Sequence, residues 1–169
     1  RGYHDLAEEH CDRLAKSTSS SDVRRSIPLV RAEVMVAQAE TETDLKLAIA
    51  AIDKAGEMLG QFVKENPSHS RASEARTSLG WLLKRKAQFL SAASGIEREP
   101  AEVAKFQAET LKTYVATEDF YRGCIKDLQA VTPQTPEIEN AVMEARIDLP
   151  KAMMEHARLP AVDARETAA

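Results

Sequence analysis

The sequence predicts an all-α protein, and three observations support this prediction. Aromatic residues make up only 5% of the 169 residues, whereas strands favour aromatic and β-branched side chains. The residues that favour helices, which are Ala, Leu, Glu, Lys and Arg, are abundant. Apolar residues also recur at spacings of three and four, which is the period of a helix with one buried face.

Six segments carry this period, and turn-forming residues separate them. They span residues 3–16, 22–40, 44–65, 70–93, 100–130 and 136–160. A serine-rich run separates the first two segments, and its side-chain oxygens can cap the free amides of the next helix. Asn66-Pro67 ends the third segment, because proline cannot continue a helix. Pro100 and Pro136 begin the last two segments, where a missing amide costs nothing.

Glycines and prolines inside the segments give further expectations. Gly56 and Gly60 lie four residues apart on the third segment, and we expect a neighbouring helix to come close there. Gly95 is expected to end the fourth segment. Pro28 either bends the start of the second segment or delays it, and Pro150 is expected to interrupt the sixth.

The length of the chain predicts a single domain, which we expect to be helical over residues 1–160, with a frayed tail over residues 161–169. A chain of this size buries about 70% of its unfolded surface, so it can form a core without disulfides. Cys11 and Cys124 are expected to be small buried residues, and a bridge between them is left open. No run of about 18 apolar residues occurs, so no membrane span is expected.

Charge and motifs argue against several functional classes. The net charge is −4, whereas nucleic-acid-binding proteins carry a basic excess on one face. The densest basic run, residues 84–86, is interpreted as a solvated helix face. Glu-x-x-His metal motifs, glycine-rich phosphate loops and Gly-x-Ser-x-Gly elbows are all absent from the sequence. Neighbouring acids such as Glu118 and Asp119 are expected on polar faces. We therefore predict no enzyme activity, no catalytic residue, no metal ligand and no cofactor.

One stretch of the third and fourth segments resembles a known repeat. Ala55, Leu59 and Phe62, followed by Asn66-Pro67, resemble the second helix and terminal proline of a tetratricopeptide repeat. The residues that follow resemble the start of the next repeat, at Ala72, Ala75 and Leu79-Gly80. The resemblance is to the variety found in bacterial cell-envelope assembly and division proteins, and it covers residues 55–80 well.

The sequence also departs from that family. Trp81 follows Leu79-Gly80, whereas the family places its aromatic residue before this pair. The segments are longer than the usual helices of the family. A Glu-Ala-Arg triplet recurs at residues 74–76 and 144–146, which favours a long helical hairpin repeated about twice.

The resemblance implies an architecture and a function. It implies antiparallel helical hairpins stacked as a short, right-handed α-solenoid, whose concave surface holds an extended peptide or another protein's helix. It also points to a bacterial envelope or periplasmic location.

Three functions follow from these observations. We predict a scaffold that binds a protein or peptide, with Trp81, Tyr114 and Tyr121 as candidate partner-binding residues. The alternative is a structural bundle that self-assembles, which long helices with charged outer faces also suit. The third possibility is a small-molecule site in a helical cavity, which a carboxylate of perturbed pKa facing a pocket would favour.

Overall fold

A computed structural model describes residues 2–159 of the chain, which contain six helices and no strand. The helices are α1 (Tyr3–Ser17), α2 (Ser21–Thr41), α3 (Leu45–Glu65), α4 (Ala72–Ile96), α5 (Pro100–Ala130) and α6 (Pro136–Ala157). The all-α prediction is confirmed, and each helix begins and ends within a few residues of its predicted segment. The predicted frayed tail lies outside the described residues. Among the described helices, none has the length and apolar character needed to cross a bilayer.

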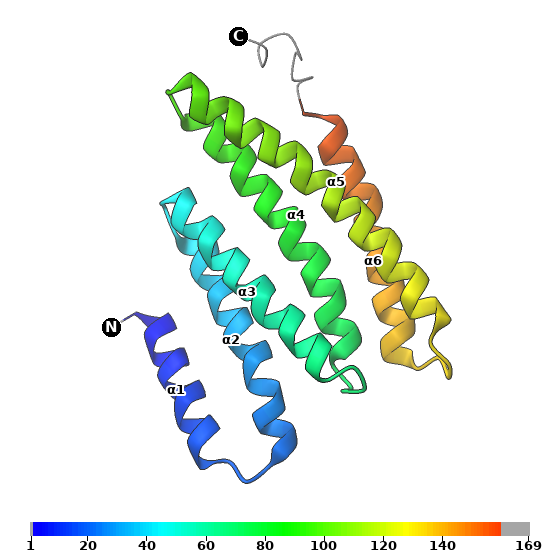
Figure 1. Cartoon of the computed structure of the whole chain (residues 1–169). Coiled ribbons are helices and arrows are strands. Elements are labelled where there is room, and N and C mark those ends of the chain that lie inside the picture. The colour runs from blue at the N-terminus through cyan, green and yellow to red at the C-terminus, as the bar shows by residue number, and fades with distance from the viewer. Residues whose placement is uncertain (1, 160–169) are drawn as a thin grey trace.

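The helices from α1 to α5 follow one another across the molecule, and α6 passes behind α5 in this view (Figure 1). Each helix packs against the one before it, and α6 also packs against α4. As a result, α4 has the most neighbours, because it contacts α3, α5 and α6. The α-solenoid of stacked hairpins stays a prediction.

Short polar side chains begin several helices, as the turns in the sequence predict. The side-chain oxygens of Ser20, Asp44 and Thr135 each accept a hydrogen bond from a free amide in the following first turn. These bonds satisfy donors that have no partner within the helix. Pro100 and Pro136 occupy first-turn positions of α5 and α6.

The expected helix breaks at Pro150 and Gly95 are wrong, and so is the delayed start of the second helix at Pro28. Helix α6 continues through Pro150, and α2 begins at Ser21 with Pro28 inside it. An interior proline removes one backbone hydrogen bond, but Ala145 and Ala152 on either side of Pro150 are fully buried. Their packing holds α6 together across the missing bond. Helix α4 likewise runs through Gly95 and ends at Ile96, before the extended residue Glu97.

The largest cluster of buried side chains joins α2, α3 and α4. Its buried members are Leu29, Ala32, Ala39, Ala48, Ile52, Ala55, Leu59, Phe62, Ala75, Leu82 and Phe89. Many of them are alanines, which let helix backbones approach one another. Cys11 and Cys124 are buried and unbridged, so their predicted role as small core residues is confirmed.

The close approach of two helices occurs at Gly80 rather than at the glycines of α3. A Cβ atom added at Gly80 would lie 2.5 Å from Cε1 of Tyr121 on α5. The same atom at Gly56 would lie 4.0 Å from Leu82, and at Gly60 it would meet nothing within 4 Å. The expectation is therefore wrong for Gly60, whereas Gly56 meets α4 in an ordinary van der Waals contact that is not crowded.

The basic run of α4 is not a solvated face, so that interpretation of residues 84–86 is wrong. Lys84 is only 8% exposed, and its Nζ lies 3.7 Å from a carboxylate oxygen of Asp148 on α6. Arg85 donates to both carboxylate oxygens of Glu40 at the end of α2, with an Nε–O distance of 2.6 Å. Each of these cations therefore reaches a different neighbouring helix.

Lys86 extends the pattern to two more helices. Its Nζ lies 2.9 Å from Asp53 on α3 and 3.9 Å from Glu109 on α5. Successive residues of a helix project about 100° apart, so three in a row point in three directions. Other helices surround α4 at this level, so each of the three cationic side chains reaches a carboxylate on a different helix.

The repeated Glu-Ala-Arg triplet does not mark the same point of two equivalent helices. Glu74 lies in the first turn of α4, whereas Glu144 lies near the middle of α6. The alanines that follow them, Ala75 and Ala145, are both buried. The two triplets share a buried alanine but differ in their distance from the start of the helix.

Candidate functional site: a cavity at the end of helix α6

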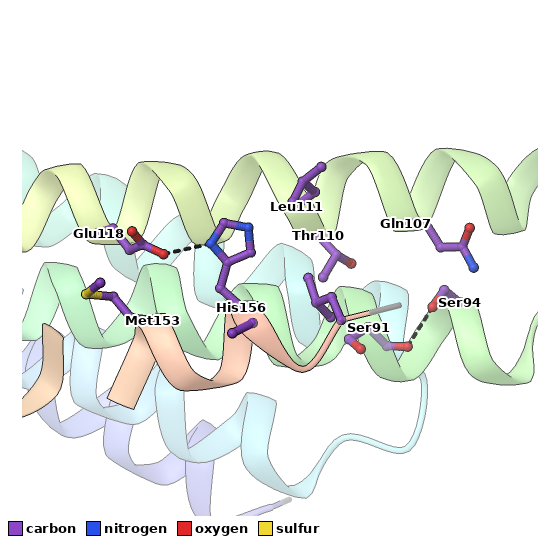
Figure 2. Close-up of a pocket in the computed structure, with 10 residues that line it drawn as sticks. Ser91, Ser94, Gln107, Thr110, Leu111, Glu118, Met153 and His156 are labelled. Carbon is purple, nitrogen blue, oxygen red and sulfur yellow. Dashed lines mark hydrogen bonds and ion pairs between the residues drawn. The ribbon is translucent and has the colours of Figure 1, made fainter. Parts of the chain in front are cut away.

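A cavity of about 560 Å³ lies between α4, α5 and the C-terminal end of α6. Its lining residues are Ser91, Ser94, Gln107, Thr110, Leu111, Glu118, Met153, His156, Ala157 and Leu159. Figure 2 shows side chains of α4 and α5 on the two sides of this space, with His156 entering from α6. Apolar and polar groups both line it, as is usual for binding cavities.

The charged group of the cavity is the Glu118 carboxylate on α5, which contacts His156 on α6 (Figure 2). The His156 Nδ1 atom lies 2.7 Å from a carboxylate oxygen of Glu118, whose side chain is 12% exposed. Arg122 donates to the other carboxylate oxygen at 2.9 Å. Burial alone would raise the pKa of Glu118, but the hydrogen bonds from His156 and Arg122 outweigh it and lower that pKa. Glu118 is therefore a carboxylate at neutral pH.

A second polar network lies beside this pair. The Tyr114 ring stacks on the His156 ring, with centroids 6.0 Å apart. The Tyr114 hydroxyl donates to Glu155 at 3.1 Å, and Gln88 donates to the same oxygen at 2.9 Å. Burial and the nearby charge of Glu155 raise the pKa of Tyr114. The tyrosine thus stays protonated and acts as a hydrogen-bond donor that fixes the last turn of α6.

The lowered pKa of Glu118 gives a prediction about pH. Glu118→Gln is expected to lower the Tm by about 3 °C at neutral pH, because it removes the charge that His156 and Arg122 bind. The pKa of Glu118 lies below its ordinary value of 4.5 in the folded protein, so the folded state binds fewer protons than the unfolded state. The contribution is fully present above pH 4.5 and is lost as the pH falls through the folded pKa.

Thermal unfolding followed by circular dichroism across this pH range measures the effect. Asp119→Asn is the matched control, because Asp119 binds the same arginine at 3.0 Å but its side chain is 70% exposed. It should change the Tm by less than Glu118→Gln does. A deficit of Glu118→Gln that persists unchanged well below pH 4.5 would show that the charge is not its cause.

A smaller cavity of about 210 Å³ lies between α2, α3 and α4. Trp81 lines it and packs, partly buried, against the core cluster of α2, α3 and α4. At its edge, Arg71 reaches Glu33 on α2 at 3.0 Å and Glu74 on α4 at 2.8 Å. These two hydrogen-bonded carboxylates raise the pKa of Arg71, although burial opposes them. The guanidinium group of Arg71 therefore links α2 to the start of α4 through its two ion pairs.

The three residues predicted to bind a partner do not lie at one site. Trp81 lines the smaller cavity and keeps part of its surface exposed. Tyr114 is 3% exposed and Tyr121 is 0% exposed. Tyr121 lies against Gly80, and its hydroxyl has no hydrogen-bond partner. The two tyrosines therefore support the α4–α5–α6 packing and present no surface to a partner in this structure.

Sequence reasoning missed the polar lining of the larger cavity. Ser91, Ser94 and Gln107 come from two helices, and their spacing follows no motif. The one available signal was the pairing of Glu118 with a histidine, but His156 lies 38 residues away in the chain. Only the folded arrangement brings these side chains together.

Comparisons with known proteins place no further constraint on the site. The chain matches no protein-family model, no curated protein and no solved structure. Among residues 2–159, no three His, Cys, Asp or Glu side chains gather in a cluster that could hold a metal ion. The fold and the cavity thus define a helical protein with an open, partly charged cavity.

Proposed function

We propose that this protein is a scaffold that binds a peptide segment of another protein in the cavity at the end of α6. One observation carries the proposal, which is that α6 itself packs against both α4 and α5. Its buried residues are Ala141, Val142, Ala145 and Ala152. The small buried side chains of α6 allow this helix to pack closely against α4 and α5. The cavity lies at the end of α6, where a peptide segment could continue the same packing.

The lining of the cavity indicates which segment would fit. Ser94 and Thr110 donate their hydroxyl protons to carbonyl groups of their own helices, at 2.8 and 2.7 Å. Their oxygens, together with the Glu118 carboxylate, can therefore act as acceptors toward the cavity. Leu111 and Met153 add apolar surface. The occupant we propose has small apolar side chains and free N–H donors, as the first turn of a helix presents.

The proposal includes the tetratricopeptide-like arrangement that the sequence resembles. Contact between α4 and α6, which are next but one along the chain, supports it. In stacked helical hairpins, the first helices of successive hairpins contact each other in this way. The close contact of Gly80 with Tyr121 also supports tight pairing of α4 with α5.

A binding experiment with a matched pair of variants tests this function. Peptides would be selected from a random displayed library on the wild-type protein, and their affinities would then be measured for Leu111→Arg and Val115→Arg. Leu111 is 40% exposed and lines the cavity, whereas Val115 is 45% exposed, lies one turn away on α5 and does not line it. Leu111→Arg should weaken binding by about tenfold or more, and Val115→Arg should leave it unchanged.

Amide chemical shifts in the NMR spectrum locate the bound peptide. The proposal expects the largest changes at Ser91, Ser94, Gln107 and Leu111. Peptides that bind Leu111→Arg as tightly as wild type, or that perturb only residues around Trp81, would place the binding site elsewhere. Failure to select any peptide would also count against the proposal.

A small-molecule site is a second candidate, and the charged state of Glu118 favours it. This carboxylate lines a cavity whose volume of about 560 Å³ suits a small organic ligand. A small amine or guanidinium compound would be attracted to it. Perturbation of the Glu118 and His156 signals by such compounds, without any selected peptide, would favour this second function over peptide binding.

A further inference from the structure

Helix α6 has a second apolar face, which is independent of the cavity. Met143, Ile147 and Met154 are 61%, 51% and 55% exposed, and Pro150 between them is also exposed. Their spacings of four, three and four residues place them on one side of the helix. The opposite side carries the buried residues of α6 that pack inward. A helix with apolar residues on both sides is typical of one that is covered on both.

The spacing of this stripe is symmetric when read in either direction. If a second copy of α6 runs antiparallel to the first, Met143 can lie opposite Met154 of the other copy, and Ile147 can lie opposite its Pro150. The centre of symmetry falls between residues 148 and 149. A two-fold axis at that point therefore brings each apolar residue of the stripe against another.

Charges beside the stripe are complementary in the same alignment. Glu137 and Glu144 lie in the first half of α6, and Lys151 and Arg158 follow in and after its second half, all exposed. Helical geometry places these four on one side of the stripe. In the antiparallel pair, Glu144 lies two residues, or about 3 Å, from the level of Lys151 of the other copy, and Glu137 has the same offset from its Arg158. The long side chains of lysine and arginine can span this offset.

Two of these charged groups, Lys151 and Glu144, have only weak interactions within their own chain. Lys151 pairs with Asp148 at 2.9 Å, one turn earlier, while its side chain is 51% exposed. Glu144 accepts a hydrogen bond from Thr77 at 3.2 Å through one carboxylate oxygen. Both side chains keep enough free surface to interact with a second chain.

We infer that a second copy of this protein covers the outer face of α6, as an antiparallel, two-fold symmetric α6–α6 dimer. Methionine side chains at both ends of the stripe adapt to each other's shape. Four ion pairs, two on each copy, would set the antiparallel direction and align the copies. The dimer is expected to weaken as salt is added, because exposed charges are screened.

Sedimentation equilibrium over a range of protein concentrations tests the dimer. Ile147→Glu should weaken the association by about tenfold or more, because it places two charges at the centre of the apolar seam. Leu47→Glu is the matched control, since Leu47 is a 58% exposed apolar residue on α3. It should leave the association unchanged. Circular dichroism of each variant checks that the helices remain folded.

Disulfide formation tests the alignment of the two copies. A disulfide needs Cα atoms within about 7 Å, so Pro150→Cys should cross-link to itself near the two-fold axis. Met143→Cys and Met154→Cys should each fail to cross-link alone and should cross-link when the two variants are mixed. The natural Cys11 and Cys124 are buried and should give little background.

Three outcomes would overturn the proposal. The first is a monomer at every concentration. The second is association that Ile147→Glu leaves intact, which would place the contact on another face. The third is self-cross-linking of Met143→Cys, which would indicate parallel helices. None of these outcomes bears on the peptide site, because Leu111 lies outside the stripe.

Discussion

Gly80→Ala is expected to destabilise the protein by about 2 kcal/mol, although alanine is the better helix former. The new Cβ atom would lie 2.5, 2.7 and 3.0 Å from three ring carbons of Tyr121. That ring is fully buried, so it cannot turn aside into solvent. Overpacking a core costs about 1–3 kcal/mol, and a contact this short belongs at the upper end. The helix propensity of alanine offsets about 1 kcal/mol of that cost.

Gly60→Ala provides the control, because both glycines lie inside helices. A Cβ atom at Gly60 would meet nothing within 4 Å, so only the helix propensity changes. This variant should gain about 0.5–1 kcal/mol. Denaturant unfolding gives both free energies of unfolding. Equal stabilisation by the two substitutions would mean that α4 and α5 do not approach each other at Gly80.

The second large effect concerns the ion pair between Lys84 and Asp148. Asp148→Ala is expected to cost about 2–3 kcal/mol, because it leaves the ammonium group of Lys84 buried without its carboxylate. Breaking a fully buried pair costs about 3–5 kcal/mol, and the 23% exposure of the Asp148 side chain reduces this. Lys84→Met should be nearly neutral, because it removes the buried charge and keeps the length of the side chain. Asp148 then still pairs with Lys151.

Denaturant unfolding of these variants, with Lys151→Met as the control, tests this asymmetry. Lys151 also binds Asp148, but its side chain is 51% exposed, so its loss should cost less than about 0.5 kcal/mol. Similar losses for Lys84→Met and Asp148→Ala would indicate that the attraction between the two charges dominates, and not the burial of Lys84.

The helices could be predicted from the sequence because their signals are local. Apolar spacing identifies a helix, and residues such as Ser20 and Asp44 mark its start. The failure at Pro150 has a non-local cause, since the packing of α6 against α4 and α5 compensates for the lost hydrogen bond. A local pattern does not contain that information.

The environment of α4 could not be predicted for a related reason. Periodicity shows which side of a helix is apolar, but it does not show how many neighbours the helix has. Lys84, Arg85 and Lys86 resemble a solvated run until other helices are placed around α4. Gly80 and Gly60 also look alike in the sequence, and only the position of Tyr121 distinguishes them.

The candidate site was even less accessible to sequence reasoning. The cavity exists because α6 ends where α4 and α5 still have side chains to cover. Its lining depends on the relative position of three helix segments. Aromatic residues suggested a binding role for Tyr114 and Tyr121, but large aromatic side chains also fill cores, and both are buried.

The uneven packing around α4 also has a consequence for local unfolding. The ion pairs of residues 84–86 tie α4 to α2, α3, α5 and α6, whereas α1 packs mainly on α2. Opening of α1 alone would break few of the contacts that hold the other helices. We therefore expect the backbone amides of α2 to α6 to exchange their hydrogens as one cooperative unit, and those of α1 to exchange separately and faster. The protein can thus lose its first helix transiently while the cavity and the outer face of α6 keep their shape.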